Sequence, residues 1–282
     1  MQSLDEIIRR LAPLHKPLGP PEPGDWLAVH DEPGQTFSEY LAQDPVLATP
    51  DRRTIVIQPI GHFSGAKNNI PLATAEFLER YFQLPTRIEP AFAVDDSWPA
   101  SSKRIHPTWG DRQLNAGFIL EDVLKPKLPE DAAAYLGLTS WDLWPRPGWN
   151  FVFGMASIKA RVGVWSIYRN GDPSGGPDAF RRALRRTLRT ATHETGHMFS
   201  LLHCTAFQCN MCGSNSQKES DRLPLYLCPQ CLAKLKWATG ADLEKRFSAL
   251  RDFSVKHGMQ PEADFFERSA ELTKASRPMT SR

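Results

Sequence analysis

The sequence has no long apolar segment and no strong excess of charge. None of its segments approaches about eighteen consecutive apolar residues, so no transmembrane helix is predicted. Its N-terminus mixes acidic and basic residues without the apolar run of a signal peptide, which indicates an intracellular, cytoplasmic protein. The 34 basic and 32 acidic side chains are spread along the chain and leave a formal net charge of +2. This balance argues against nucleic acid or an anionic membrane as a partner.

Several common catalytic signatures are also missing. The sequence has no GxSxG element, no P-loop and no dinucleotide-binding glycine motif. Cysteine is absent until position 204, and all five cysteines fall between positions 204 and 231. In a reducing compartment such clustering favours metal ligation over disulfides, and an odd count fits a disulfide framework poorly.

The chain is long enough to bury a large core, with 282 residues of which 41% are hydrophobic. Strand-like and helix-like segments alternate, which predicts an α/β fold with a mainly parallel twisted sheet. Two strand-like segments without a helix between them, 150–157 and 161–169, predict one antiparallel edge strand. The other expected elements are strands at 54–59 and 86–94, helices at 73–84 and 114–128, and a helical turn leading into a strand within 132–144.

A further long helix is predicted at 178–200, with Pro177 well placed at its first turn. One face of this helix is apolar and another is basic. We interpret the basic face as solvated, and the alternative is a surface for an acidic partner. The basic residues are Arg181, Arg182, Arg185, Arg186 and Arg189.

The end of this helix carries the sequence HETGHMFSLLH, with three histidines and a glutamate in eleven residues. On a helix His193 and His197 differ by about 40° in azimuth and about 6 Å in rise, so both imidazoles can reach one metal ion. Glu194 lies one residue further round, where its carboxylate can accept a proton from metal-bound water without being a ligand. We interpret His62 and His106 as loop residues.

His203 can join the first two histidines only if the helix stops. On an unbroken helix it would lie about 240° round from His197 and point away from the ion. A sharp turn near Ser200 would instead let His203 supply a third nitrogen, which gives the open site of a hydrolytic zinc enzyme. The sequence therefore predicts a helix end within three residues of His197 and strained backbone at Ser200. Because glycine is the usual residue in such a turn, Ser200→Gly is expected to stabilise the fold by about 1 kcal/mol.

This motif and the residues after it resemble a known family. HETGHMFSLLH is similar to the metzincin signature HExxHxxGxxH, with Ser200 in place of the glycine. A cysteine directly after the third histidine, a second cysteine five residues on, a Cys-x-Met element and a later CxxC are similar to archaemetzincins, which are intracellular metzincin-like zinc proteases. The resemblance rests on specific motif residues over 192–235. From about residue 53 onward it rests only on the order of the expected strands and helices.

The resemblance implies a metzincin-like fold and a zinc metallopeptidase that cleaves peptides or unfolded polypeptides as a monomer. It implies a catalytic zinc on His193, His197 and His203, attack by a zinc-bound water, and Glu194 as general base. It also implies that Met211 forms the hydrophobic turn beneath the zinc, although on its own Met211 would be interpreted as an ordinary core methionine. No cysteine precedes the active-site helix, so the cysteine-switch propeptide of some secreted metzincins is excluded.

Spacing and resemblance give different ligand sets for a second zinc. Cys209, Cys212, Cys228 and Cys231 form two CxxC pairs fifteen residues apart, which is typical of a zinc ribbon. The resemblance implies Cys204, Cys209, Cys228 and Cys231, with Cys212 as a bystander. We prefer the second set because Cys204 directly follows the third histidine. Four thiolates close a coordination sphere, so this zinc would be structural and the chain would bind two Zn²⁺ ions.

These expectations divide the chain into three parts. Residues 1–50 are expected to be an N-terminal extension that lies over a core, and residues 51–200 an upper catalytic subdomain that ends in the active-site helix. Residues 201–282 are expected to be a small, zinc-braced lower subdomain with C-terminal helices. The alternative function is a non-catalytic zinc-binding module whose cysteines and arginine-rich helix bind a protein. Glu194 argues against it, because such a module needs no carboxylate between two ligands.

Overall fold

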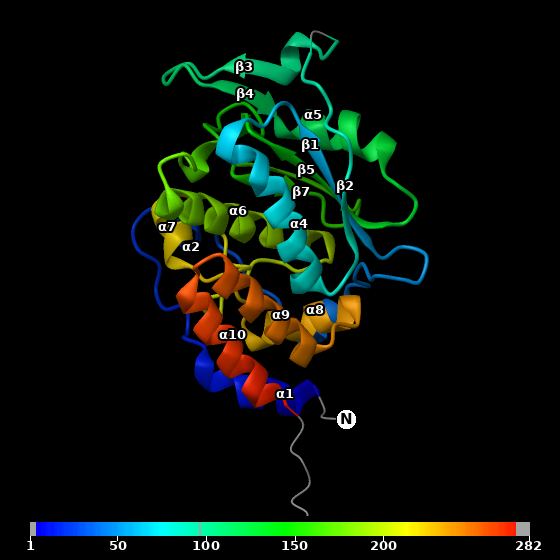
Figure 1. Ribbon diagram of the computed structural model, residues 1–282, viewed down its shortest axis with the longest axis vertical. Coiled ribbons are helices and arrows are strands. Elements are labelled where there is room, and N and C mark those ends of the chain that lie inside the picture. The colour runs from blue at the N-terminus through cyan, green and yellow to red at the C-terminus, as the bar shows by residue number, and fades with distance from the viewer. Residues whose placement is uncertain (1–3, 96, 275–282) are drawn as a thin grey trace, which may run out of the picture.

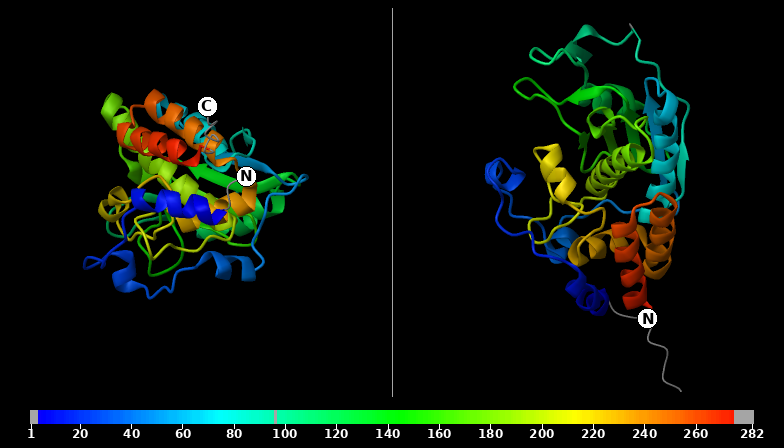
Figure 2. Two further views of the ribbon diagram at one scale, coloured as in Figure 1. Left: turned by 90° about the horizontal axis from the view of Figure 1, so that it is seen from below. Right: turned by 60° about the vertical axis from the view of Figure 1, so that its left-hand side comes forward.

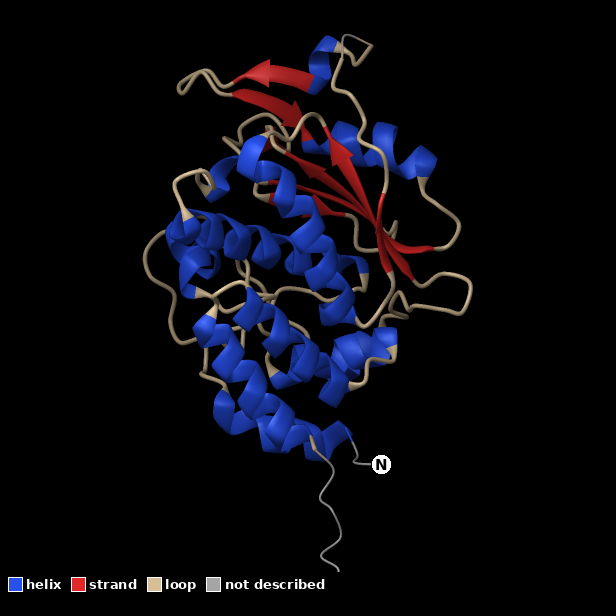
Figure 3. Cartoon of the chain, viewed as in Figure 1, coloured by secondary structure: helices blue, strands red, loops and turns tan. Residues whose placement is uncertain are grey.

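The upper half of the molecule is built around a sheet, and the lower half is mostly helical (Figures 1 and 3). The structure is a computed structural model that describes residues 4–95 and 97–274. The larger sheet has five strands in the order β2–β1–β5–β8–β7. They are β1 (Thr54–Ile60), β2 (Thr86–Ile88), β5 (Ala132–Thr139), β7 (Gly154–Ala156) and β8 (Val162–Ser166).

Four of these strands are parallel, and β7 pairs antiparallel with β8 at the edge. The expected mainly parallel sheet with one antiparallel edge strand is confirmed. Helices α4 (Asn69–Phe82) and α6 (Pro177–Met198) cover one face of the sheet. Helix α5 (Ala116–Phe118) and a π-helical segment, Ile119–Leu124, lie on the other. The sheet is therefore buried on both faces, which explains the continuous apolar run of β1.

A second, three-stranded sheet was not expected from the sequence. Its order is β3–β4–β6, with β3 antiparallel to β4 and β4 parallel to β6. Each strand has only three or four residues, which is too short for an alternating pattern to stand out. The strands are β3 (Lys103–Ile105), β4 (Arg112–Asn115) and β6 (Asp142–Trp144).

Three expected elements differ from the structure. The helical turn expected at the start of 132–144 is absent, because β5 begins at Ala132 and all eight of its residues are buried. Burial between two helical layers here outweighs the helix propensity of its alanines. The strand expected at 86–94 ends at Ile88, shortly before Pro90, which has no N–H for a strand ladder.

The third difference is the helix expected at 114–128. Its first residues belong to β4, and the Asn115 side chain then accepts a hydrogen bond from the Phe118 N–H at 2.8 Å, which caps α5. The π-helical segment follows, and a 3-10 turn at Lys125–Lys127 contains Pro126. The segment is therefore helical but irregular, with three types of turn in succession.

The lower half consists of four helices from the C-terminal part of the chain and a segment from the N-terminus. Helix α9 packs against both α10 and α4, and so links the two halves. Helix α1 (Leu4–Leu11) packs against α8 and α10 at the foot of the molecule. The four C-terminal helices are α7 (Gln217–Arg222), α8 (Pro229–Thr239), α9 (Leu243–Lys256) and α10 (Gln260–Thr273).

The N-terminal segment takes part in the core as well as covering it. Leu11 and Tyr40 are fully buried, and the Tyr40 hydroxyl donates to the Phe199 carbonyl at 3.0 Å. From α1 the chain rises along the molecule to α2 (Trp26–Val29), beside α7, and continues to α3 (Phe37–Ala42) (Figure 2, right). Residues 1–3 and 275–282, which belong to the expected first and last parts of the chain, lie outside the described residues.

Candidate functional site

The long helix expected at 178–200 is α6, which begins at Pro177 and ends at Met198. Ser200 has a φ of 65°, in the left-handed region. The helix end near His197 and the strained backbone predicted at Ser200 are therefore both confirmed. The chain reverses at this turn, and His203 returns toward the last turn of α6.

The expected gain in stability from Ser200→Gly has to be revised, because the Ser200 hydroxyl accepts a hydrogen bond from the Val46 N–H at 3.0 Å. Glycine relieves roughly 1 kcal/mol of left-handed strain but removes a hydrogen bond of similar worth. We expect Ser200→Gly to change the free energy of unfolding by less than about 0.5 kcal/mol. Ser200→Ala keeps the strain and loses the bond, so it should destabilise by about 1–2 kcal/mol in urea unfolding. Equal values for the two variants would contradict this account.

The turn at Ser200 brings three imidazoles together. One ring nitrogen from each of His193, His197 and His203 lies within 4.8 Å of the others. The Nε2 atoms of His193 and His197 are only 3.0 Å apart. At zinc–nitrogen bonds of about 2.0–2.1 Å, two ligands at neighbouring tetrahedral corners lie about 3.3 Å apart. The spacing of the rings is therefore close to that of a tetrahedral zinc site.

The hydrogen bonds at the opposite ring nitrogens support the same conclusion. His193 Nδ1 donates to the Asn210 carbonyl at 2.8 Å, and His197 Nδ1 donates to the Leu201 carbonyl at 2.7 Å. A carbonyl oxygen can only accept, so each Nδ1 carries a proton and each Nε2 of the neutral ring presents a lone pair. Two lone pairs that face each other repel unless a cation lies between them. The donor set therefore fits a metal ion that binds imidazole.

Burial keeps these two rings neutral. Desolvation, together with a smaller effect of the nearby His203 ring, lowers the pKa of His197 to about 4. Desolvation also lowers the pKa of His193 well below its usual value, with further lowering by the other two rings. Metal binding requires neutral imidazole, so at neutral pH neither ring has to lose a proton first.

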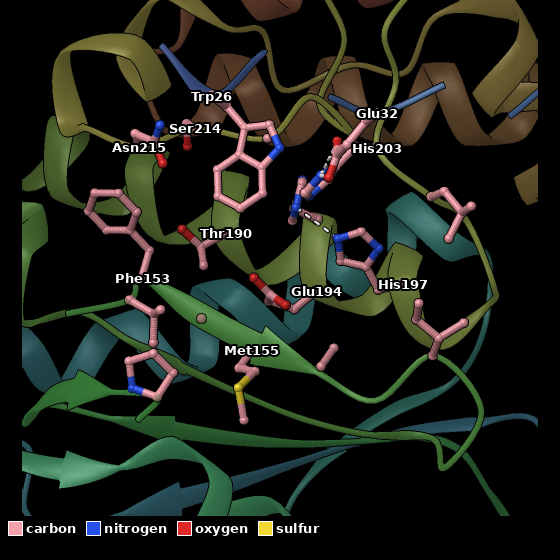
Figure 4. Close-up of a pocket in the computed structure, with 18 of the residues that line it drawn as sticks. Trp26, Glu32, Phe153, Met155, Thr190, Glu194, His197, His203, Ser214 and Asn215 are labelled. Carbon is pink, nitrogen blue, oxygen red and sulfur yellow. Dashed lines mark hydrogen bonds and ion pairs between the residues drawn. The ribbon is translucent and has the colours of Figure 1, made fainter. Parts of the chain in front are cut away.

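Glu194 follows the first histidine on α6 and points into the same space (Figure 4). Its carboxylate lies against the backbone of β7, because a Cβ added at Gly154 would be only 2.6 Å from Oε1. Burial raises the pKa of the Glu194 carboxyl to about 8, although the nearby Arg189 charge acts in the opposite direction. No described residue donates a hydrogen bond to this carboxylate. It is therefore free to exchange a proton with a bound molecule near neutral pH.

These groups line a cavity of about 590 Å³. Helix α6 forms the floor of this cavity. Met155 comes from β7, and Phe153 is the residue before that strand. Trp26 lies opposite them, beside Ser214 and Asn215 (Figure 4). The cleft is thus lined mostly by apolar side chains, and its polar side chains lie both at the histidines and around Thr190, Ser214 and Asn215. Other lining residues include Glu32, Arg146, Trp149, Phe151, Arg189, Thr190 and Leu202.

Met211 lies directly beneath the metal-binding turn of α6. A Cβ added at Gly196 would be 2.6 Å from the Met211 sulfur, so the two residues are in close contact between the first two histidines. Met211 is fully buried, and its carbonyl accepts a hydrogen bond from the Cys204 N–H at 2.9 Å. This position agrees with the role that the family resemblance implies for it.

A second cluster lies below this site, where four cysteine sulfurs come within 4.8 Å of one another. Two of these sulfurs, on Cys204 and Cys228, are 3.7 Å apart, and tetrahedral zinc–thiolate bonds of about 2.3 Å place sulfurs about 3.8 Å apart. Cys212 is outside the cluster, and its thiol donates to the Phe207 carbonyl at 3.1 Å. The geometry thus favours the ligand set that the resemblance implies, which contains Cys204, over the zinc-ribbon set, which contains Cys212. The clustered residues are Cys204, Cys209, Cys228 and Cys231.

The expectation of a solvated basic face on α6 is wrong for three of its arginines. Arg185 pairs with Glu262 of α10 at 2.6 Å, and Arg186 pairs with Asp221 of α7 at 2.5 Å. Arg189 is buried and donates to a backbone carbonyl. Because α7 and α10 pack against this face, the acidic groups come from the same chain. The ion pairs of Arg185 and Arg186 therefore give no support to an external acidic partner for these two residues.

Sequence reasoning missed two residues of the N-terminal segment that reach the site. Both carboxylate oxygens of Glu32 accept from Nδ1 of His203, at 2.8 Å and 3.0 Å. The Trp26 ring meets the His203 ring edge-on at a centroid distance of 5.1 Å. The segment therefore supplies one wall of the cleft and holds the third histidine. No local pattern in the sequence marks either residue.

The remaining histidines considered as ligands lie apart from both clusters. His106 Nδ1 accepts hydrogen bonds from the backbone N–H groups of Thr108 and Trp109. His62 lies in the loop after β1. Neither belongs to a group of potential metal ligands within the described residues. Across the same residues, every helix is too short or too polar to cross a lipid bilayer.

Comparisons with known proteins show which family the chain resembles. A family model described as Peptidase family M54 matches residues 131–237. Archaemetzincin-2 of Macaca fascicularis is 34% identical over 281 residues, which cover 88% of this chain and 76% of that protein.

Two solved archaemetzincin structures are also similar. The one from Methanopyrus kandleri is 27% identical with a TM-score of 0.54, and covers 68% of this chain and 98% of its own. The one from Archaeoglobus fulgidus, complexed with malonate, is 28% identical with a TM-score of 0.50, and covers 64% of this chain and 99% of its own. The metzincin-like fold expected from the sequence is thereby confirmed. The chain belongs to the archaemetzincins, peptidase family M54, and is a zinc metallopeptidase.

Proposed function

We propose that the cleft hydrolyses peptide bonds, with a catalytic zinc on His193, His197 and His203 and with Glu194 as general base. One observation carries the proposal: two unprotonated Nε2 atoms face each other at 3.0 Å beside a buried carboxylate that lines the same cavity. When bound there, zinc supplies a Lewis acid that polarises the scissile carbonyl and acidifies water.

Glu194 has the surroundings that a general base needs. Its raised pKa, about 8, lies close to neutral pH, where a group can both accept and return a proton. Contact with the Gly154 backbone fixes the carboxylate at the edge of β7. In the proposed reaction Glu194 takes a proton from the attacking water and passes it to the leaving amine.

The shape of the cleft supports a peptide substrate in extended form. Among the described strands β7 has a single neighbour, β8, so its other edge is open along the cavity. An extended peptide can pair with such an edge through backbone hydrogen bonds, while side chains enter the apolar walls. All of these groups come from one chain, which supports a monomer as the active form.

We further propose that the four clustered cysteines hold a structural zinc, so that the chain binds two Zn²⁺ ions. This ion would tie the chain just after His203 to the start of α8 and brace the segment that carries Met211. The proposed subdomains, 51–200 above and 201–282 below, then form the two walls of the cleft. Residues 1–50 extend the lower wall with Trp26 and Glu32.

Glu32 is proposed to position His203. A carboxylate that accepts from the far nitrogen of a ligating histidine fixes the orientation of the ring and raises its basicity. We expect Glu32→Gln to weaken zinc binding at the histidine site by about tenfold, measured by competition with a chromogenic chelator. Glu22→Ala is the matched control, because Glu22 lies in the same segment but pairs with Arg222 on the surface. Unchanged zinc affinity in Glu32→Gln would rule out this role.

A peptide library gives the test of the proposed function. Zinc-loaded protein should cleave members of the library, chelator-treated protein should not, and added zinc should restore cleavage. Elemental analysis run in parallel should give two zinc ions per chain. Protein that holds zinc at the histidine site and cleaves no library member would contradict the proposal.

A further inference from the structure

The cavity contains two arginines that are not paired with acids. Arg189 and Arg146 both line it, and within the described residues neither has a carboxylate within 4.0 Å. The neighbouring arginines of α6 are different, because Arg181, Arg185 and Arg186 each form an ion pair. Of the two α6 arginines that form no ion pair with a described residue, Arg182 is exposed outside the cleft, whereas Arg189 is buried and lines the cleft.

Arg189 is unusual because it is only 4% exposed. Its Nη2 donates to the Cys212 carbonyl at 2.9 Å, and its Nε has no hydrogen-bond partner. Burial lowers the pKa of Arg189 to about 10, so the guanidinium is still charged at neutral pH. An unpaired buried charge is unfavourable unless a ligand compensates for it.

The acidic groups around Arg189 are already engaged or lie beyond ion-pair distance. The Glu219 carboxylate accepts from the backbone N–H groups of Trp26 and Asn215, at 2.8 Å and 2.7 Å. Its charge acts on Arg189 only from a distance. Glu194 lies further along the same helix and has no oxygen within 4.0 Å of an Arg189 nitrogen. Among the described residues no carboxylate therefore forms an ion pair with the Arg189 guanidinium.

The position of Arg189 places this field next to the bond that would be cleaved. Arg189 precedes His193 by one helical turn, which is about 6 Å along α6. Thr190, the residue after Arg189, surrounds a space together with Phe153, Ser214 and Asn215, on the side of Glu194 away from His197 (Figure 4). A substrate side chain one position from the scissile bond could enter this space.

We infer that the space around Arg189 is a subsite for a carboxylate, so that the enzyme prefers peptides with an acidic group beside the scissile bond. The inference rests on the proposed function for its orientation relative to that bond. Arg189 binds the carboxylate at the base of the subsite, and the exposed Arg146 adds positive charge at the rim. The carboxylate comes from a Glu or Asp side chain or from the C-terminus of a short peptide.

Binding to an inactive, zinc-loaded protein tests this directly. In Glu194→Ala protein, fluorescence anisotropy measures the affinity of labelled seven-residue peptides in which one Glu is moved along a neutral sequence and compared with Gln at each position. One position should bind about tenfold tighter with Glu than with Gln. Each peptide is made with a free and with an amidated C-terminus. Comparing the two forms distinguishes binding of the C-terminal carboxylate from binding of a Glu side chain. If every pair binds equally, the inference is overturned.

Variants assign the preference to its residue. Added to Glu194→Ala, Arg189→Gln should reduce the tenfold difference to less than twofold, whereas Arg182→Gln should leave it unchanged, because Arg182 is exposed on the same helix outside the cleft. Zinc content and near-ultraviolet circular dichroism show whether Arg189→Gln is folded. If it is not, Arg189→Lys and Arg146→Gln decide. Lysine keeps the charge but lacks the paired N–H groups of the guanidinium, so a reduced preference in Arg189→Lys with a full one in Arg146→Gln supports Arg189. A full preference in Arg189→Lys with none in Arg146→Gln overturns the inference. A full preference in folded Arg189→Gln assigns the carboxylate elsewhere and overturns the inference.

The binding test does not depend on turnover. If wild-type protein hydrolyses no peptide while the acidic preference is present, the proposed function fails and the subsite stands. If wild-type protein hydrolyses peptides with no acidic preference, the subsite fails and the proposed function stands.

Discussion

Glu194→Ala should reduce peptide hydrolysis by about a thousandfold or more while both zinc ions stay bound, because Glu194 is proposed as base and not as ligand. His197→Ala should lose hydrolysis together with one zinc ion. The kcat of cleavage of a fluorogenic peptide and the zinc content of each purified variant provide the two measurements.

Glu194→Gln serves as the control for packing. It keeps the side-chain volume against Gly154 but cannot accept the proton, so it should be as inactive as the alanine variant. Wild-type activity in either variant, with the histidine-site zinc present, would end the proposed role of Glu194 as base.

The second large effect concerns the cysteine cluster. Cys204→Ser should lower the zinc content from two to one per chain and destabilise the fold by several kcal/mol, because metal binding at such sites contributes folding free energy. Cys212→Ser should retain both ions and lose about 1 kcal/mol at most, since it gives up only the contact with the Phe207 carbonyl. Elemental analysis and urea unfolding measure the two quantities.

The opposite result has a clear meaning. If Cys212→Ser releases a zinc ion and Cys204→Ser does not, the ligands follow the ribbon spacing. His197→Ala is a useful comparison, because it also loses one ion but should leave urea stability closer to that of the wild-type protein.

Much of the metal centre could be predicted because its information is local. The spacing of His193 and His197 places both rings on one helix face wherever the helix lies. The need for His203 to return fixed the helix end and the unusual backbone at Ser200, and both are present. These are consequences of helix geometry that three-dimensional packing did not alter.

The cysteines show where local reasoning ends. Spacing alone favoured Cys212 as a ligand, because CxxC pairs usually bind one ion. The chain reversal after His203 instead brings Cys204 toward Cys228 and turns Cys212 toward Phe207. Only the resemblance to a family placed Cys204, and not Cys212, with the other three cysteines. The spacing of cysteines in the sequence does not tell how the chain folds back on itself.

Long-range contacts could not be predicted at all. Glu32 and His203 are separated by 171 residues, and nothing near either one marks the pair. The same is true of Arg185 and Arg186, whose acidic partners lie on α7 and α10. A basic stripe on a helix is compatible with solvent, a partner or the chain's own acids, and tertiary packing decides among them.

The contact between Glu32 and His203 also bears on when the enzyme becomes active. A ribosome makes Glu32 long before His203, and α1, at the start of the same segment, packs against α10. The wall of the cleft that carries Trp26 and Glu32 therefore has no complete support until residues 260–273 have been synthesised. A growing chain is thus without a finished cleft until α10 has been made.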